Sequence, residues 1–210
     1  MAITLLGYWR SSAAYRVRIA LAVKGLSFDS IAINLLEGEQ RGAAYRGLNP
    51  QGLVPFLRDD PAALSQSLAI IEYLDETYPD PPLLPGTSAE RAHARALAQT
   101  IASDIHPLNN LRVLKYLKRE LGQDQAAIDA WSQNWITEGF TALEAAAGTF
   151  LAGDRLTIAD ICLVPQMYNA RRIATDLTPF PKLVALDERL CARPAFAAAS
   201  PEAQPDAPTE

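Results

Sequence analysis

The sequence predicts a small α/β domain followed by a larger all-helical domain. Up to about residue 80, strand-like apolar runs alternate with helix-like apolar faces. Residues 78–88 hold four prolines and a glycine, a density at which no helix survives. Every apolar pattern after this stretch has a helical period. We therefore expect domains at 1–80 and 89–199, a linker at 81–88 and, from its Pro, Ala and Glu content, a flexible tail at 200–210.

The first domain has the pattern βαβ followed by ββα. Residues 3–8 and 28–35 are β-prone, and Ser11 or Ser12 can cap a helix between them that Gly25 ends. A polar segment at 37–47 precedes further strands at 53–57 and 62–64 and a helix that residues 65–67 open. The βαβ half predicts a parallel strand pair, and the tight turn at 59–61 predicts an antiparallel pair.

Pro55 restricts where the third strand can lie. Proline has no N–H to donate to a sheet, so we expect Pro55 at the start of an edge strand or in a special turn. A cis Val54–Pro55 bond is an alternative that the residues alone do not decide.

The second domain contains five expected helices and two capping boxes. The helices are 89–105, 109–121, 125–150, 158–174 and 181–191. Thr87 with Glu90, and Thr157 with Asp160, have the spacing at which the two side chains satisfy each other's backbone N–H groups.

Composition excludes several classes of protein. The formal net charge of −5 argues against a protein that binds nucleic acids non-specifically through phosphate contacts. No apolar run approaches the roughly 18 residues of a membrane span, and no secretory leader begins the chain, so we expect a cytoplasmic protein. Two histidines and two cysteines, Cys162 and Cys191, form no zinc motif. We expect no metal site, and we expect both cysteines to be non-catalytic.

Two serine clusters lie where a strand leads into a helix, Arg10-Ser11-Ser12 and Ser65-Gln66-Ser67. Helix N-termini favour anions, although such serines can also be simple N-caps. A helix terminus stabilises an anion by about 0.3–1 kcal/mol. A hydroxyl that donates to a thiolate adds about 1.5–3 kcal/mol. Together these interactions could keep a bound thiol, whose ordinary pKa is about 8.5, largely ionised at neutral pH.

The helical domain offers two further candidates. Pro107 interrupts a helix, so His106 lies at a break where side chains can turn into a cleft, and Asn109 or Asn110 can cap the resumed helix. A lone histidine is more often structural or solvated. Arg172 ends another helix, where an arginine usually serves the helix dipole.

Several motifs resemble the zeta class of glutathione transferases. Residues 9–21 (WRSSAAYRVRIAL) resemble the hallmark Ser-Ser-Cys-x-Trp-Arg-Val-Arg-Ile-Ala-Leu. Further similar segments are 48–50, 54–55, 66–74, 104–114, 157–160, 163–166, 176–179 and the tail at 204–210. The resemblance thus covers essentially the whole chain.

This resemblance implies a thioredoxin-like domain with a cis Val54–Pro55 bond, an all-helical domain, a homodimer and glutathione as cofactor. The implied activity is isomerisation of maleylacetoacetate to fumarylacetoacetate, in phenylalanine and tyrosine breakdown, by transient addition of the glutathione thiolate. The implied catalytic residues are Arg10, Ser11, Ser12, His106, Arg112 and Arg172. The implied glutathione-binding residues are Ser11, Ser12, Ala13, Ala14, Tyr15, Arg16, Gln40, Val54, Gln66, Ser67, His106, Asn110, Leu111 and Arg112.

The resemblance also implies a role for each part of the site. Ser11 would hydrogen-bond the glutathione sulfur, and the Val54 backbone would pair with the cysteinyl moiety. Gln66 and Ser67 would hold the γ-glutamyl end, and Gln40 would reach the glycyl end. The arginines would bind the carboxylates of the substrate, because the guanidinium group is planar and permanently charged.

The chain departs from the hallmark at Ala13, where much of the family has cysteine, and at Tyr15, where it has tryptophan. A mechanism that needs a protein thiol at position 13 is therefore closed to this chain. Maleylpyruvate is an alternative substrate, which the Ser-Ser pair and the Val-Arg-Ile-Ala-Leu run disfavour. A glutathione transferase or dehalogenase of small α-halo acids, and a non-enzymatic glutathione-binding module, are further alternatives.

Overall fold

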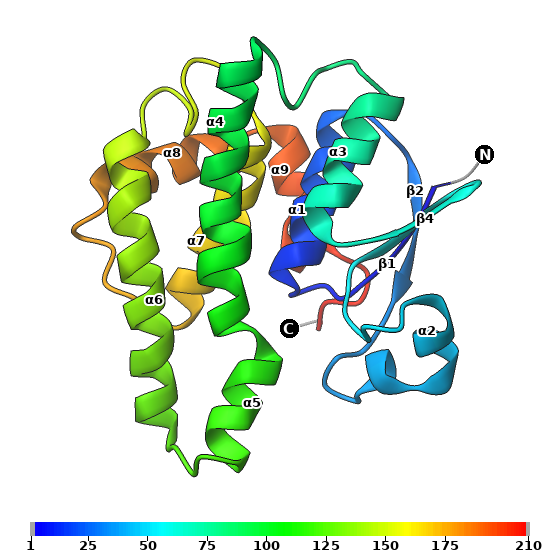
Figure 1. The fold of residues 1–210 in the computed structure, drawn as a ribbon, viewed down its shortest axis with the longest axis vertical. Helices are drawn as coiled ribbons and strands as arrows, with labels where there is room; N and C mark the ends of the chain where they lie inside the picture. The colour runs from blue at the N-terminus through cyan, green and yellow to red at the C-terminus, as the bar shows by residue number, and fades with distance from the viewer. Residues whose placement is uncertain (1–2, 209–210) are drawn as a thin grey trace. The chain divides into compact units, whose positions relative to one another are not determined.

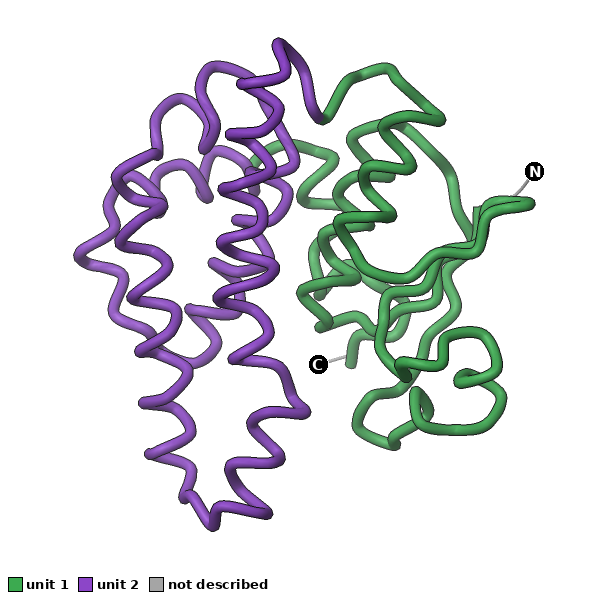
Figure 2. Tube along the Cα trace, in the orientation of Figure 1, with its two compact units in different colours: residues 1–83, 192–210 green, residues 84–191 purple. Residues whose placement is uncertain are grey.

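The computed structural model describes residues 3–208, and the chain divides into two compact units (Figures 1 and 2). Unit 1 comprises Met1–Leu83 together with Ala192–Glu210, and unit 2 comprises Leu84–Cys191. Unit 1 is thus built from two separate stretches of sequence. Among the described residues, no helix is both long enough and apolar enough to span a membrane.

Unit 1 is built on a four-stranded mixed sheet. Its strands are β1 (Ile3–Gly7), β2 (Phe28–Ala32), β3 (Phe56–Asp59) and β4 (Ala62–Ser65), in the order β2-β1-β3-β4. β1 is parallel to β2 and antiparallel to β3, and β3 is antiparallel to β4. The helices are α1 (Ser12–Val23), α2 (Ala43–Leu48), α3 (Ser67–Thr77) and α9 (Pro194–Ala199). The predicted βαβ and ββα halves are confirmed.

Helix α1 begins and ends where its sequence predicts. Ser11 is the N-cap, and Gly25 follows the helix with a φ of +66°, a left-handed conformation that glycine adopts without steric cost. The apolar face that includes Val17, Ile19 and Leu21 is fully buried. This face packs α1 against both α3 and α9 (Figure 1).

Pro55 precedes a strand in the interior of the sheet. The Val54–Pro55 bond is cis, and Pro55 lies in the turn before β3. Because β3 pairs with strands on both sides, the edge-strand alternative for Pro55 is wrong and the turn alternative is correct. A proline just outside the strand removes no ladder hydrogen bond.

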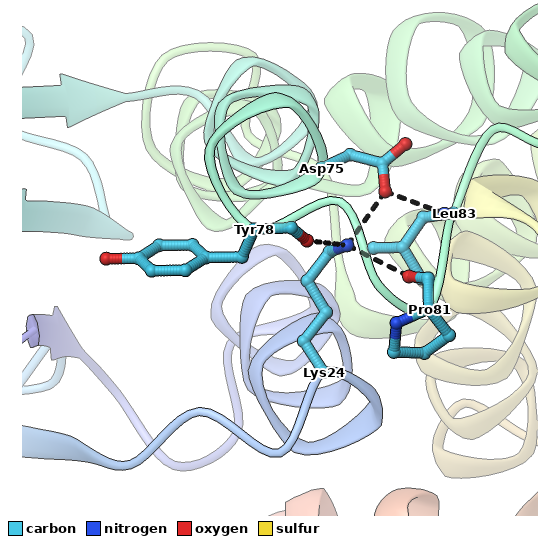
Figure 3. A network of polar contacts seen from close by, with 5 residues as sticks. All are labelled: Lys24, Asp75, Tyr78, Pro81 and Leu83. Carbon is cyan, nitrogen blue, oxygen red and sulfur yellow. Dashed lines mark hydrogen bonds and ion pairs between the residues drawn. The ribbon is translucent and has the colours of Figure 1, made fainter.

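Lys24, directly after α1, ties this helix to α3 and to the chain that follows α3 (Figure 3). Its side chain is fully buried. Its Nζ donates to Asp75 Oδ1 at 2.8 Å, to the Tyr78 carbonyl at 2.7 Å and to the Pro81 carbonyl at 3.0 Å. Asp75 Oδ1 also accepts the Leu83 N–H at 2.7 Å. The ammonium group therefore uses all three protons inside the protein.

The carboxyl-terminal stretch differs from the expected tail. Residues 192–208 belong to unit 1, where α9 packs on α1 and a 3-10 turn at Pro201–Ala203 follows. Gln204 Nε2 donates to the Ser200 carbonyl at 2.8 Å, and the Trp9 N–H donates to Asp206 at 2.9 Å. The described part of the expected flexible tail is thus held by hydrogen bonds, whereas residues 209–210 of it lie outside the described residues.

Unit 2 is all-helical. It contains α4 (Ser88–Gln99), a π-helical turn (Thr100–Ile105), a 3-10 turn (His106–Asn109), α5 (Leu111–Arg119), α6 (Gln125–Ala146), α7 (Ile158–Arg172) and α8 (Pro181–Cys191). The helix expected at 89–105 therefore changes form after Gln99, and the one expected to start at 109 starts at Leu111. Pro107 contributes to this interruption, because it lacks the N–H that would continue the regular hydrogen-bond pattern of the helix.

Both predicted capping boxes are present, but their surroundings differ. Thr87 and Glu90 are exposed at the start of α4. At the start of α7, Asp160 is fully buried and accepts hydrogen bonds from the Thr157 N–H at 2.8 Å and from the Leu151 N–H at 2.8 Å. Asp160 thus fixes the preceding loop as well as the helix end.

Gly139 allows α6 to approach the π-helical turn. A Cβ at this position would overlap Cδ1 and Cγ1 of Ile105, which is itself buried. We expect Gly139→Ala to lower the free energy of unfolding by about 1–3 kcal/mol, because overpacking outweighs the helix propensity that alanine adds. Urea unfolding of the purified protein measures this change.

The matched control is Gly47→Ala, because Gly47 also lies in a helix, α2, but no other atom lies near its Cβ position. This substitution should leave stability unchanged or raise it slightly. Gly139→Ala should cost less stability in an Ile105→Ala background than in the wild type, because the shorter side chain at position 105 leaves room for the added methyl group. Equal stabilities for Gly139→Ala and the wild type would contradict the close approach.

Candidate functional site

The strand register of unit 1 brings three loops to one edge of the sheet. Phe56, at the start of β3, pairs with Leu6 near the end of β1 and with Ser65 at the end of β4. The chain that leaves β1, the chain that enters β3 and the chain that leaves β4 are therefore neighbours. They carry three of the predicted groups of residues, namely Ser11 to Arg16, Val54, and Gln66 with Ser67.

Ser11 is an N-cap that keeps a proton to donate. Its Oγ accepts the Ala14 N–H at 3.3 Å, and its side chain is half-buried at the start of α1. Ser11 therefore caps α1, and because accepting one hydrogen bond leaves its O–H able to donate to an anion, a functional role stays a prediction. Ser12 and Ala13 are also half-buried in the first turn of the helix.

The next three predicted residues have buried side chains. The exposed fractions of Ala14, Tyr15 and Arg16 lie between 0% and 3%, so these side chains support the first turns of α1 from inside unit 1. Arg16 Nη1 donates to the Ser67 Oγ at 3.3 Å. This bond links α1 to the first residue of α3, so Arg16 orients Ser67 within unit 1.

Gln66 has a strained backbone. Its φ of +71° and ψ of 114° are rarely adopted by residues with a side chain. Its exposed Nε2 donates to Oε1 of Gln51 at 2.9 Å. Sequence reasoning did not find Gln51, because a pairing of two exposed amides from different loops leaves no periodic or motif signal.

Two side chains fix the turn that carries Val54. The Leu53 carbonyl accepts the Tyr45 hydroxyl at 2.6 Å and the Asn49 Nδ2 at 2.7 Å. Burial raises the pKa of the Tyr45 phenol, so it remains a donor at neutral pH. The backbone of Val54 is therefore held next to the cis proline.

Gln40 lies in a 3-10 turn (Glu39–Arg41) behind this loop. It is buried, and its Oε1 has no hydrogen-bond partner among the described residues. Gly52 passes so close that a Cβ would lie 2.8 Å from the Gln40 carbonyl oxygen. This close approach fixes the backbone of Gln40, and a buried amide oxygen without a hydrogen-bond partner is uncommon in folded proteins.

In unit 2, the predicted residues His106, Asn110, Leu111 and Arg112 gather at the break between the 3-10 turn and α5. Asn110 is the N-cap of α5, where its Oδ1 accepts the Arg112 N–H at 3.1 Å. Leu111 and Arg112 are exposed, and His106 is half-buried. Of the two candidate caps, Asn110 is thus the one used.

Two predicted residues remain, Arg172 and Arg10. Arg172 is exposed in the last turn of α7. Its Nη2 donates to Oδ1 of Asn169 at 2.8 Å. Arg10, in unit 1, lies with its guanidinium 5.1 Å from the centre of the Trp9 ring. Arg172 and Arg10 thus each contact one neighbouring side chain.

Neither cysteine has the environment of a nucleophile. Cys162 is fully buried in α7. Burial and the nearby Asp187 carboxylate raise the pKa of the Cys191 thiol to about 12. Both observations support the expectation that the reactive sulfur does not come from the protein.

Comparison with known proteins identifies the family. Residues 5–82 match the Glutathione S-transferase N-terminal domain, and residues 136–194 match the Glutathione S-transferase C-terminal domain. The chain is 52% identical to a probable maleylacetoacetate isomerase of Vibrio cholerae, over 99% of each protein. The chain belongs to the glutathione S-transferase family.

Solved structures of glutathione S-transferases agree with this assignment. A zeta-class maleylpyruvate isomerase in its holo form is similar with a TM-score of 0.95 and 45% identity, over 98% of this chain and 100% of the other. A maleylacetoacetate isomerase of Methylobacterium extorquens AM1 with bound malonate and glutathione is similar with a TM-score of 0.94 and 38% identity, over 98% and 100%. The zeta-class resemblance and the expected thioredoxin-like and helical folds are confirmed.

Proposed function

We propose that this chain is a glutathione-dependent cis–trans isomerase that converts maleylacetoacetate to fumarylacetoacetate. The observation that carries the proposal is the common sheet edge at which Ser11, Val54 and the Gln66-Ser67 pair converge. The similarity to maleylacetoacetate and maleylpyruvate isomerases supports the same conclusion. The homodimer, the cytoplasmic location and the role in tyrosine breakdown stay predictions.

The residues of unit 1 fit glutathione. An anion suits the N-terminus of α1, where backbone N–H groups point outward and Ser11 offers a proton. The buried Oε1 of Gln40, which has no hydrogen-bond partner among the described residues, supports a ligand-binding role for this amide. We propose that Gln66 and Ser67 hold the γ-glutamyl end, that the Val54 backbone pairs with the cysteinyl moiety and that Gln40 holds the glycyl end.

When bound, glutathione would supply a thiolate whose addition turns the cis double bond into a single bond that can rotate, and whose expulsion restores the double bond in the trans form. The chain's own residues make this possible. Ser11 and the first turn of α1 favour the ionised thiol, and Arg10 and Arg112, with Arg172, bind the carboxylates of the substrate and stabilise the charge that develops on its carbonyl. His106 and Asn110 contribute to the substrate-binding surface of unit 2. Ala13 provides no thiol, so no protein cysteine takes part at that position.

The role of Ser11 is tested by Ser11→Ala. A hydrogen bond from a hydroxyl to a charged group contributes about 1.5–3 kcal/mol, so its loss should raise the pKa of bound glutathione by about one to two units. Turnover at pH 7 should fall by about tenfold or more, and the pH–rate profile should shift to higher pH. The ultraviolet absorbance of the bound thiolate, titrated against pH, measures the thiol pKa directly.

Ser11→Thr is the matched control, because threonine keeps both the hydroxyl and the N-cap. It should retain most of the activity, whereas Ser11→Ala also loses the cap of α1. Thermal unfolding of both variants separates that structural loss from the chemical one. An unchanged thiol pKa in Ser11→Ala would remove Ser11 from its proposed role.

The substrate is tested by following isomerisation of maleylacetoacetate and of maleylpyruvate in the presence and absence of glutathione. We expect both reactions to need glutathione and kcat/KM to be larger for maleylacetoacetate. A larger value for maleylpyruvate would reassign the substrate but keep the reaction. Binding of glutathione without turnover of either compound would leave a binding module.

A further inference from the structure

The loop between β1 and α1, residues 8–11, is bonded to the carboxyl-terminal stretch of the chain. The Trp9 N–H donates to Asp206 Oδ2 at 2.9 Å, across 197 positions of sequence. The Trp9 carbonyl accepts Nη2 of Arg18 at 2.9 Å. Both backbone polar groups of this one residue are therefore held by charged side chains, and hydrogen bonds to charged groups are among the stronger ones.

Arg18 is itself held firmly. It is 4% exposed, and its Nε donates to the carbonyl of Ala199, the last residue of α9, at 3.0 Å. Its Nη1 lies 3.5 Å from the Tyr8 carbonyl oxygen. Burial lowers the pKa of Arg18 to about 10, so the guanidinium remains charged at neutral pH, and the carboxylates of Asp206 and Glu202 act in the opposite direction to burial. A single buried cation thus joins the loop to α9.

The position of Asp206 is fixed by the fold of its own segment. Gln204 Nε2 donates to the carbonyls of Ser200 at 2.8 Å and Ala198 at 3.2 Å, and the Ala207 N–H donates to the Gln204 carbonyl at 3.0 Å. These bonds make a compact turn directly after α9. Asp206 therefore reaches Trp9 from an ordered support.

The bonds at Trp9 act on the residues that follow it. The Ser11 N–H donates to the Tyr8 carbonyl at 3.0 Å, which closes a tight turn around Trp9 and Arg10. The Arg10 guanidinium lies over the Trp9 ring, 5.1 Å from its centre. A displacement of the Trp9 backbone would thus move both the hydroxyl of Ser11 and the charge of Arg10.

We propose that Asp206 and Arg18 are positioning residues that hold the loop at 8–11 in its catalytic geometry. This inference rests on the proposed function, because it concerns the same Ser11 and Arg10. Neither Asp206 nor Arg18 needs to touch glutathione or substrate. Asp206 and Arg18 would hold the Ser11 hydroxyl in place before glutathione binds. The hydroxyl then needs no reordering to donate to the thiolate, which favours the ionised thiol.

The test compares Asp206→Ala with Asp206→Asn. Alanine removes the acceptor for the Trp9 N–H, whereas asparagine keeps an acceptor oxygen in a side chain of the same size. Asp206→Ala should raise the pKa of the bound glutathione thiol by about half a unit to one unit and lower kcat about three- to tenfold. KM for glutathione should change less than twofold or so, because the proposed γ-glutamyl and glycyl contacts lie elsewhere in unit 1. Asp206→Asn should restore both values to near wild type.

Glu202→Ala is the matched control. Glu202 lies in the same segment as Asp206, and its carboxylate also acts electrostatically on Arg18. Its removal leaves the hydrogen bond between the Trp9 N–H and Asp206 in place. The pKa of the glutathione thiol bound to Glu202→Ala should equal that of the thiol bound to the wild type. If Asp206→Ala does not fold, Arg18→Lys takes its place, because lysine keeps the charge but cannot bridge the Trp9 and Ala199 carbonyls with a planar group. Its thiol pKa should also rise.

The outcomes separate the two proposals. A wild-type protein that binds glutathione with a lowered thiol pKa, together with a folded Asp206→Ala variant of unchanged thiol pKa and kcat, overturns the positioning role alone. Equal losses in Asp206→Ala and Asp206→Asn also overturn it, since the charge and not the bond to Trp9 would then matter. A wild-type protein that does not bind glutathione removes the proposed function, and this inference with it.

Discussion

Replacing Lys24 with methionine should lower the free energy of unfolding by about 3–5 kcal/mol, the usual cost of removing one partner from a buried ion pair. Methionine fills much of the same volume but leaves Asp75 without its cation and the Tyr78 and Pro81 carbonyls without their donor. Guanidinium chloride unfolding at pH 7 measures the loss. The transition should also broaden if the chain after α3 loosens before the sheet of unit 1 melts.

A double-mutant cycle isolates the pair from its surroundings. Asp75→Leu alone leaves the buried ammonium group uncompensated, so it too should be strongly destabilising. The Lys24→Met/Asp75→Leu variant should be more stable than the sum of the two single losses predicts, with a coupling of about 1–3 kcal/mol. Additive losses would mean that the two carbonyls, and not the carboxylate, account for the stability that Lys24 provides.

Replacing Asp160 with alanine should cost about 3–4 kcal/mol, because it removes an N-cap partner and leaves the Leu151 and Thr157 N–H groups buried without acceptors. Glu90→Ala is the matched control. It removes the equivalent residue of the other capping box, which lies at the surface, so its effect should be much smaller. Thermal and urea unfolding of both variants measure the difference, and equal losses would contradict a special role for the buried box.

The two capping carboxylates should also respond to pH in opposite directions. Burial raises the pKa of Asp160 from 3.8 to about 6, in spite of the hydrogen bonds that it accepts. Its native state then holds a proton that its unfolded state has lost, so its contribution to stability is full below pH 3.8 and is lost as the pH rises through 6. Hydrogen bonds from Thr87 lower the pKa of Glu90, whose contribution is instead lost on acidification.

This difference is measurable against a residue that does not titrate. Between pH 6 and pH 5, the stability of the wild type relative to Asp160→Asn should increase by about 1 kcal/mol. The same comparison with Glu90→Gln should show the wild type losing part of its advantage as the pH falls below the ordinary range of a glutamate. A flat difference for Asp160 across this interval would show that its carboxyl is ionised throughout.

Local signals predicted much of the fold. The strand and helix halves of unit 1, both capping boxes and the helix at Pro181–Cys191 follow from periodicity and from short motifs whose partners lie within a few residues. The π-helical turn did not follow, because no short motif in the sequence marks it, and the packing of its Ile105 against Gly139 of α6 joins residues far apart in the sequence. The burial of Lys24 was also hidden, since its partners come from α3 and from a proline-rich stretch that composition marks only as a linker.

In the candidate site, too, the local positions of residues could be predicted from the sequence, whereas the long-range contacts that support them could not. The resemblance to zeta-class transferases supplied the candidate residues, and Ser11, Gln66 and Asn110 lie at helix starts as their sequence positions suggest. Their roles toward glutathione and substrate stay predictions. What the sequence did not reveal is the support behind them, such as the Gln51 amide beside Gln66 and the Asp206 carboxylate on Trp9. The residues around Asp206 look like a low-complexity tail, and only a contact across the whole chain gives them a role.

Because unit 1 is made of the two ends of the chain, it can be completed only at the end of translation. Unit 2 is one continuous stretch, so all of its helices have been translated before α9 appears. Until the last residues are translated, α1 cannot pack against α9, and the Trp9 N–H cannot donate to Asp206. Since elongation proceeds at roughly 5–20 residues per second, α1 lacks its neighbour α9 for several seconds during synthesis. The loop at residues 8–11 is thus among the last parts of the chain to reach its final geometry.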